Sequence, residues 1–254
     1  MQTTVHEIYI YNADETGIFY EALPHRGHFF KGERCVEGKL SKKRFTALVC
    51  ANMDGSDKPP PLIIGKYQKP RCFKGGKSLP LPYKGSMKAW MTADLFKAWL
   101  SELDDRMRRE RRNVLLFLDN CSSHTKAVNE LRLHHVKVEW LVANSSSITQ
   151  PMDQGVIRAF KASSCKMLLQ NVLAVLEGGK PLPTTSLKDA IFMLHSAWQA
   201  VMPLVISHCF HHAGFKTEAA AEEGKDSPVD EKMLQDEVRY IIVAFVDYEC
   251  RIKH

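Results

Sequence analysis

The sequence contains no Cys-x-x-Cys pair, and its seven cysteines are odd in number. An odd set without paired spacing argues against a disulfide framework and against a zinc knuckle, so we expect reduced thiols. Long apolar runs are also missing, because stretches such as VLLFL at 114–118 are too short to cross a membrane. The first residues, MQTTVHEIYIYN, lack the basic start and the apolar stretch of a signal peptide. We therefore expect an intracellular protein without a membrane partner.

The chain also lacks a strong excess of charge. A net charge of +6 over 254 residues permits a polyanionic partner such as DNA without requiring one. A hydrophobic content of 44% and a charged content of 25% are typical of a soluble globular protein. The length allows one large domain or two small ones, each with a buried core.

Strand-like segments fill the first part of the chain. β-branched and aromatic residues predict strands at 5–12, 44–51 and 59–66. The residues NADETG at 12–17 have turn chemistry, so we expect the first strand to end there. The prolines of the third segment suit an edge or the start of a strand.

Helices dominate the second part. A helix is predicted at 92–112, and a buried strand at 113–120 follows, then a short helix and a strand at 136–142. A further helix begins near Pro151, and another at 186–202 opens with a capping box. Strands first and helices last, with one strand–helix–strand unit between, predict an α/β fold: a mixed sheet with helices packed on it.

Three aspartates occupy positions where such folds gather reactive groups. Asp14 follows the first predicted strand, Asp119 ends the apolar run and Asp153 opens a helix. Neighbouring carboxylates repel one another, but divalent cations such as Mg²⁺ reverse that balance. Other interpretations stay open, since Asp14 suits a turn and Asp153 suits a helix dipole. Asp119 is harder to explain this way, because an acid on a buried strand needs a partner.

Six blocks occur in order over roughly residues 8–161. They are IYNADETGIF, LVCANMDGSDKPPPLIIGK, PRCFK, AWMTADLF, LLFLDNCSSH and QPMDQGVIRAFK. Together they resemble the catalytic domain of the pogo/Tigger branch of mariner-like transposases. This is the DDE-superfamily endonuclease domain shared with centromere protein B and the jerky proteins. The resemblance implies an RNase H-like fold that uses Mg²⁺ or Mn²⁺ to cleave DNA strands and join the freed 3′ ends to a target.

The resemblance also implies which residues form the site. The acidic triad, and with it the metal ligands, would be Asp14, Asp119 and Asp153, the third acid being Asp in this branch. We expect an RNase H-like catalytic domain at 1–178 and a helical extension of it at 179–215. An acidic flexible linker at 216–231 and a C-terminal helix at 232–254 would follow.

Other residues are candidates for supporting roles. Asn120 and His124 are possible auxiliary residues near the metal site, although capping or packing would explain His124 equally well. Lys39, Lys42, Lys43 and Arg44 form a basic cluster that suits DNA contact or nuclear import, with a solvated turn as the alternative. His208 and His212 lie one helical turn apart, but no third ligand supports a zinc site there.

The expected function is that of a transposase-derived nuclear protein that cleaves or transfers DNA strands, or a domesticated remnant of one. DNA and further copies of the chain are the expected partners, and no small-molecule substrate is expected. A catalytically inactive nuclear module that binds nucleic acid or protein is the alternative, and a truncated product without a separate function is another.

Two departures from the family pattern motivate these alternatives. No helix-turn-helix region precedes the first block, so recognition of specific DNA ends is not expected from this sequence. The loop before the third acid reads LVANSSSITQPMDQG, where the family pattern resembles LPPNTTSLLQPMDQG. Val142 and Ala143 in place of two prolines free the backbone, so we expect looser positioning of Asp153.

Overall fold

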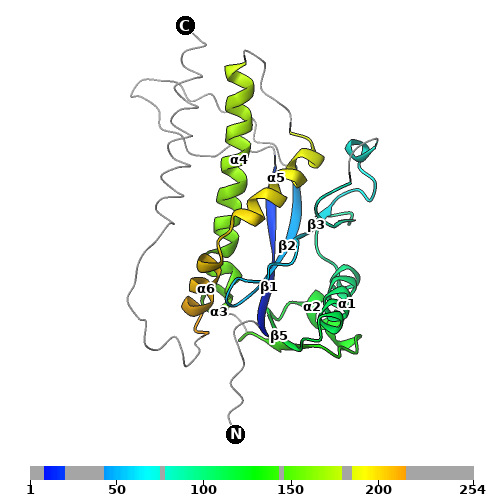
Figure 1. Cartoon of the computed structure of the whole chain (residues 1–254). Helices are drawn as coiled ribbons and strands as arrows, with labels where there is room; N and C mark the ends of the chain where they lie inside the picture. The colour runs from blue at the N-terminus through cyan, green and yellow to red at the C-terminus, as the bar shows by residue number, and fades with distance from the viewer. Residues whose placement is uncertain (1–8, 21–42, 75–77, 143–145, 179–184, 216–254) are drawn as a thin grey trace.

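A six-stranded mixed sheet is the centre of the fold, in the strand order β4-β3-β2-β1-β5-β6. The computed structural model describes residues 9–20, 43–74, 78–142, 146–178 and 185–215 (Figure 1). The strands are β1 (Ile10–Phe19), β2 (Arg44–Asn52), β3 (Leu62–Gly65), β4 (Tyr83–Gly85), β5 (Val114–Leu118) and β6 (Val136–Trp140). β1 pairs antiparallel with β2 and parallel with β5, so it is the strand that joins the two halves of the sheet.

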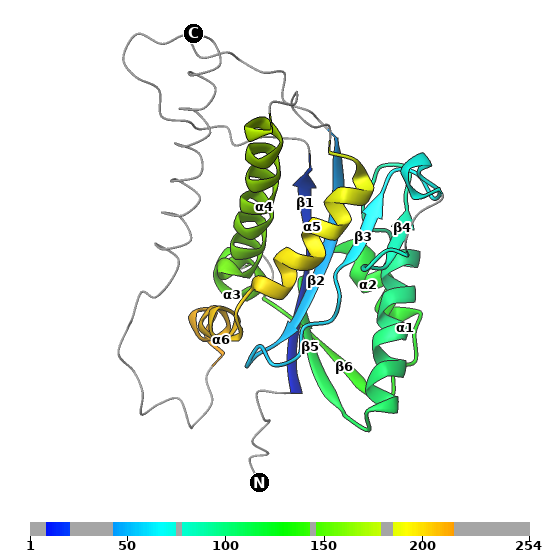
Figure 2. The ribbon, with the colours of Figure 1, turned by 45° about the horizontal axis from the view of Figure 1, so that its top comes forward.

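The helices form a layer on each face of the sheet (Figure 2). On one side lie α1 (Ala93–Arg109) and α2 (Ser122–Asn129). On the other lie α4 (Ile157–Glu177), α5 (Leu187–Ala200) and α6 (Pro203–His212). Three short turns complete the set: η2 (Arg71–Phe73), α3 (Ser146–Thr149) and the π-helical turn η3 (Met152–Val156). The predicted α/β sheet with flanking helices is confirmed.

Alternation along the strands explains why both faces are covered. In β2, Phe45, Ala47 and Val49 enter the core with α4 to α6, whereas Leu48 and Cys50 enter the core with α1 and α2. Successive side chains of a strand point to opposite faces, so an apolar run buries both. This two-sided burial holds β1 and β2 rigidly in the middle of the molecule.

The prediction of a turn at 12–17 was wrong. Residues NADETG lie inside β1, where all of them pair with β2, from Asn12 opposite Ala51 to Gly17 opposite Thr46. Continuous pairing with β2 supplies the backbone hydrogen bonds that a turn would otherwise supply, so tertiary context overrides the local turn preference. Asp14 therefore lies in mid-strand rather than after a strand.

α5 and α6 share one hydrophobic core with the sheet, through residues such as Ile191, Trp198 and Phe210. Ser186 and Asp189 form the capping box at the start of α5. In the described residues no single helix is long and apolar enough to cross a membrane, and α5 and α6 pass that test only as a pair bent by 73°. The predicted linker at 216–231 and helix at 232–254 lie outside the described residues, and the boundary at 178 stays a prediction.

Candidate active site

The three predicted acids come from three neighbouring segments. β1 and β5 run parallel with Asn12 opposite Phe117, so two residues further along each strand Asp14 lies level with Asp119. Asp153 is in the first turn of η3, which contacts β1. The structure thus brings all three carboxyl groups within electrostatic range of one another, as the pKa shifts of Asp14 and Asp153 show.

Asp14 is the most enclosed of the three. Burial raises the pKa of Asp14 to about 8, and the negative charges of Asp153 and Glu15 add to the rise. Asp153 borders solvent, but burial of its carboxyl raises its pKa too, and the hydrogen bond donated by Asp14 only partly offsets this rise. Below about pH 8 Asp14 therefore keeps a proton and shares it with Asp153.

Asn12 ties together the segments that carry these acids. Its side chain is fully buried and donates from Nδ2 to the backbone oxygen of Phe117 on β5 (2.9 Å) and to Oε1 of Gln150 (3.3 Å). Its Oδ1 accepts a hydrogen bond from the backbone N–H of Met152 (2.9 Å), the residue before Asp153. One amide side chain thus fixes β1, β5 and the entry to η3 relative to each other.

The π-helical turn sets the direction of Asp153. Gly155 lies in it with φ of 154°, a conformation that residues with a Cβ rarely adopt. A Cβ at this position would also lie 3.0 Å from the Sγ of Cys209 on α6. The turn is therefore kinked at Gly155, and this kink lies two residues after Asp153 and just before α4.

His124 links Asp119 to a fourth acid on the opposite face of β1. The imidazole is fully buried, with Nδ1 2.7 Å from Oδ1 of Asp119 and Nε2 2.9 Å from Oε1 of Glu15. Burial alone would lower the pKa of His124, but its contacts with Asp119 and Glu15 outweigh burial and raise the pKa to about 12. The same contact lowers the pKa of Asp119. His124 is therefore an imidazolium held between two carboxylates.

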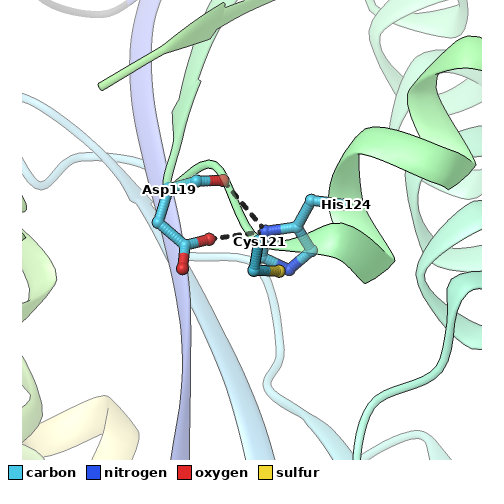
Figure 3. Close-up of side chains that lie close together, drawn as sticks. All are labelled: Asp119, Cys121 and His124. Atoms are coloured by element: carbon cyan, nitrogen blue, oxygen red, sulfur yellow. Dashed lines mark hydrogen bonds and ion pairs between the residues drawn. The ribbon is translucent and has the colours of Figure 1, made fainter. Parts of the chain in front are cut away.

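Asp119 would have to be ionised to hold a cation, and His124 keeps it so. Its buried Oδ1 lies 2.7 Å from Nδ1 of His124, and this contact lowers the pKa of Asp119. Two ligand sets are conceivable, one of hard oxygens from Asp14, Asp119 and Asp153, and one in which Cys121 and His124 join Asp119 (Figure 3).

The oxygen set is the more suitable. As a ligand, His124 would have to lose a proton from a nitrogen that already contacts a carboxylate, and its raised pKa opposes that loss. Carboxylates alone suit Mg²⁺ or Mn²⁺, which prefer hard oxygen ligands. Asp119 belongs to both sets, so the two would compete for it.

The other predicted residues have varied surroundings. Asn120 is exposed and accepts a hydrogen bond from Thr125 Oγ1 (3.1 Å), which places it at the start of α2 rather than among the carboxylates. Lys43 is exposed, and Arg44 lies over the ring of Trp90. Lys39 and Lys42 lie outside the described residues. A DNA contact at this cluster stays a prediction.

The sequence analysis missed three residues of the site: Glu15, Asn12 and Lys161. Lys161 is on α4, and its positive charge lowers the pKa of Asp153. The signal for Glu15 was available in strand alternation, because two adjacent acids in a strand must face opposite sides. No comparable pattern marks Asn12 or Lys161, whose partners come from distant parts of the chain.

Known proteins resemble this chain over most of its length. A family model described as DDE superfamily endonuclease matches residues 42–210. Mouse Tigger transposable element-derived protein 4 is 41% identical over 208 residues, which cover 82% of this chain and 40% of that protein. Human major centromere autoantigen B is 33% identical over 207 residues, covering 81% of this chain and 33% of that protein. The chain thus spans well under half the length of these relatives.

The fold is also that of a solved transposase. The crystal structure of the Mos1 strand transfer complex matches 92% of this chain and 55% of the Mos1 chain, with a TM-score of 0.52 and 14% sequence identity. A likeness at this identity concerns the fold alone, and the fold is RNase H-like. The resemblance to Tigger proteins and centromere protein B inferred from the six blocks is confirmed.

Proposed function

The chain belongs to the DDE superfamily endonuclease family, and from that premise we propose that it cleaves DNA strands with the help of divalent metal ions. The proposed catalytic residues are Asp14, Asp119 and Asp153. The observation that carries the proposal is their placement, with Asp14 level with Asp119 on paired strands and Asp153 in a turn that contacts β1; burial and then the charge of Asp153 raise the pKa of Asp14 to about 8. Such a cluster is unfavourable by itself and becomes favourable when a cation lies between the carboxylates.

Mg²⁺ or Mn²⁺ fits the proposed ligands. All three are carboxylates, and the contact with His124 lowers the pKa of Asp119, so this acid is ready to hold a cation. Divalent ions held there would supply two things: a more acidic attacking water or 3′-hydroxyl, and stabilisation of the leaving oxygen.

The chain's own groups prepare the site. Asp14 must give up its proton before it holds a cation, so we expect tighter metal binding as the pH rises toward about 8. His124 and Glu15 hold the carboxylate of Asp119 in place, because the imidazolium contacts both acids. Lys161 places a positive charge beside Asp153, where it is also suited to a DNA phosphate.

DNA as the substrate implies work in the nucleus, where a fluorescent fusion of the chain should accumulate. The activity itself is tested by nicking of supercoiled plasmid in Mg²⁺ or Mn²⁺. We expect nicking by the wild-type protein, none by Asp119→Asn, and normal activity in Asp105→Asn, which removes an exposed acid on α1. Equal nicking by wild type and Asp119→Asn, or by neither, would refute the proposal.

A second candidate is a DNA-binding module that no longer cleaves. One observation favours it: the imidazolium of His124 already compensates part of the charge on Asp119, which lessens the need for a metal ion. In this case the protein would bind DNA without any divalent ion and would show neither nicking nor metal-induced stabilisation. A thermal shift with Mn²⁺ that depends on Asp119 separates the two functions.

A further inference from the structure

One stretch of the chain is basic without acidic residues. Between Asp57 and Asp94 the sequence holds eight lysines and arginines and no Asp or Glu. One of them, Lys58, is used inside the fold, where its ammonium contacts backbone oxygens at the end of α5. Lys84 and Lys88 are exposed and form no ion pair within the described part of the chain. A surface with unpaired cations of this density attracts a polyanion.

Lys84 is part of β4, and Lys88 follows shortly after this strand, at a tightly packed edge of the sheet. β4 is the edge strand beside β3, at the far end of the sheet from β6. The ring of Tyr83 packs on Gly65, and its hydroxyl donates a hydrogen bond to the backbone oxygen of Tyr67 (2.6 Å). A Cβ at Gly85 would lie 2.6 Å from the backbone of Gln68, so the chain after β3 folds tightly against β4. The edge therefore presents its lysines from a fixed backbone.

A strained turn presents a tryptophan next to them. Ala89 has φ of 52°, which is uncommon for a residue with a Cβ and costs about 1 kcal/mol. The backbone oxygen of Ala89 accepts a hydrogen bond from Thr46 Oγ1 (2.7 Å), and its N–H donates to the backbone oxygen of Ser86 (2.7 Å). The turn leaves Trp90 57% exposed, beside the guanidinium of Arg44 at 5.4 Å from the ring centroid. The strained, hydrogen-bonded turn therefore holds the ring of Trp90 in solvent, where it is available to a ligand.

Arg44 reaches from this surface to β1, the strand that carries Asp14. Its side chain passes over Gly17 of β1, where a Cβ would lie 3.2 Å from Arg44 Cδ. Gly17 is three residues beyond Asp14 on the same strand, which corresponds to about 10 Å. Strand alternation turns Gly17 to the face of β1 opposite Asp14, the face that packs against α1 and α2, so Arg44 and Trp90 lie on that face of the sheet.

We propose that this surface, the β4-edge patch, binds an unpaired DNA strand. The patch consists of Arg44, Lys66, Tyr67, Lys84, Lys88 and Trp90. Cations suit the phosphates, and exposed aromatic rings stack on bases, which only an unpaired strand offers. Tyr67 is 64% exposed and pairs with Lys66 as Trp90 pairs with Arg44, so the patch holds two aromatic–cation pairs. The choice of DNA as the occupant rests on the proposed function.

The test measures binding without chemistry. Metal-free protein is titrated against a fluorescent oligothymidine of about 20 nucleotides, followed by anisotropy at several salt concentrations. Trp90→Ala should weaken binding about 10-fold with little change in salt dependence, because it removes stacking. The double variant Lys84→Gln/Lys88→Gln should lower the slope of log K against log salt by about 1.4, since each lost phosphate contact contributes about 0.7.

Matched controls lie at the opposite edge of the sheet. Trp140→Ala and Lys137→Gln on β6 remove an exposed tryptophan and an exposed cation, and both should bind like the wild type. Unchanged binding in the patch variants, equal losses in the controls, or tighter binding of the same sequence as a duplex would overturn the patch. The binding result is independent of cleavage. If the patch binds DNA but the protein does not nick plasmid, the endonuclease proposal is refuted and the patch proposal stands. If nicking depends on Asp119 but the patch variants bind normally, the patch proposal is refuted and the endonuclease proposal stands.

Discussion

Asn12→Ala tests whether one buried amide aligns the three acids. The change removes the hydrogen bonds from Asn12 to Phe117 and Gln150 and the one it accepts from Met152. Each bond contributes about 1 kcal/mol, and a buried N–H left without a partner costs a further ~1–3 kcal/mol. Because Met152 is fully buried, its N–H has no water to replace the amide, so we expect a loss of about 4–6 kcal/mol of unfolding free energy.

The effect on the site is the more specific result. Met152 precedes Asp153, so a released Met152 N–H leaves the third acid less well placed toward Asp14. We expect Mn²⁺ affinity to fall about 10-fold or more, as for other losses of support around metal ligands. Urea unfolding gives the stability, and calorimetric titration at a temperature where the variant is folded gives the affinity.

Asn171→Ala is the matched control. Asn171 is an exposed asparagine on α4 that donates a weak hydrogen bond to the sulfur of Met193 (3.3 Å), so its loss should change stability by less than about 0.5 kcal/mol. A destabilised Asn12→Ala protein that keeps wild-type Mn²⁺ affinity would refute the alignment role. A variant as stable as the wild type would refute the hydrogen-bond estimate as well.

Three further changes probe the site. Glu15→Gln removes a charge that holds the buried histidine, so Mn²⁺ affinity should fall about 10-fold by calorimetry, whereas Glu139→Gln on β6 should leave it unchanged. Asp14 has a pKa of about 8 in the folded protein against an ordinary value of 3.8, so the metal-free protein should lose stability as the pH rises from about 4 to 8. In urea titrations Asp14→Asn should flatten this pH dependence and add roughly 1–3 kcal/mol of unfolding free energy near pH 8. An unchanged pH dependence in the variant would contradict this prediction. Gly155→Ala forces a Cβ into φ of 154° and should cost about 1–2 kcal/mol and weaken Mn²⁺ binding, with Gly178→Ala as a control.

The strands and helices that hold the site were largely predictable, because their hydrophobic patterns are strong. The helix at 92–112 appears as α1 with Thr92 as its N-cap, and the capping box at the start of α5 is present. The predicted turn at 12–17 failed because a strand of weak β-propensity residues is held by its neighbour β2 rather than by its own preferences.

The support around the acids was not predictable from the sequence. The loop before Asp153 was expected to be loose, since prolines are missing there. Residues 143–145 lie outside the described chain, but the entry to η3 is held by Asn12 through Gln150 and Met152. Such contacts join residues about 140 positions apart, and no local pattern records them.

The central claim is that Asp14, Asp119 and Asp153 together hold a catalytic divalent ion. The most direct measurement is anomalous diffraction from crystals of the protein soaked in Mn²⁺. We expect an anomalous peak enclosed by these three carboxylates, and no such peak in Asp119→Asn crystals. A peak at Cys121 and His124 instead, or no peak on any of the three acids, would contradict it.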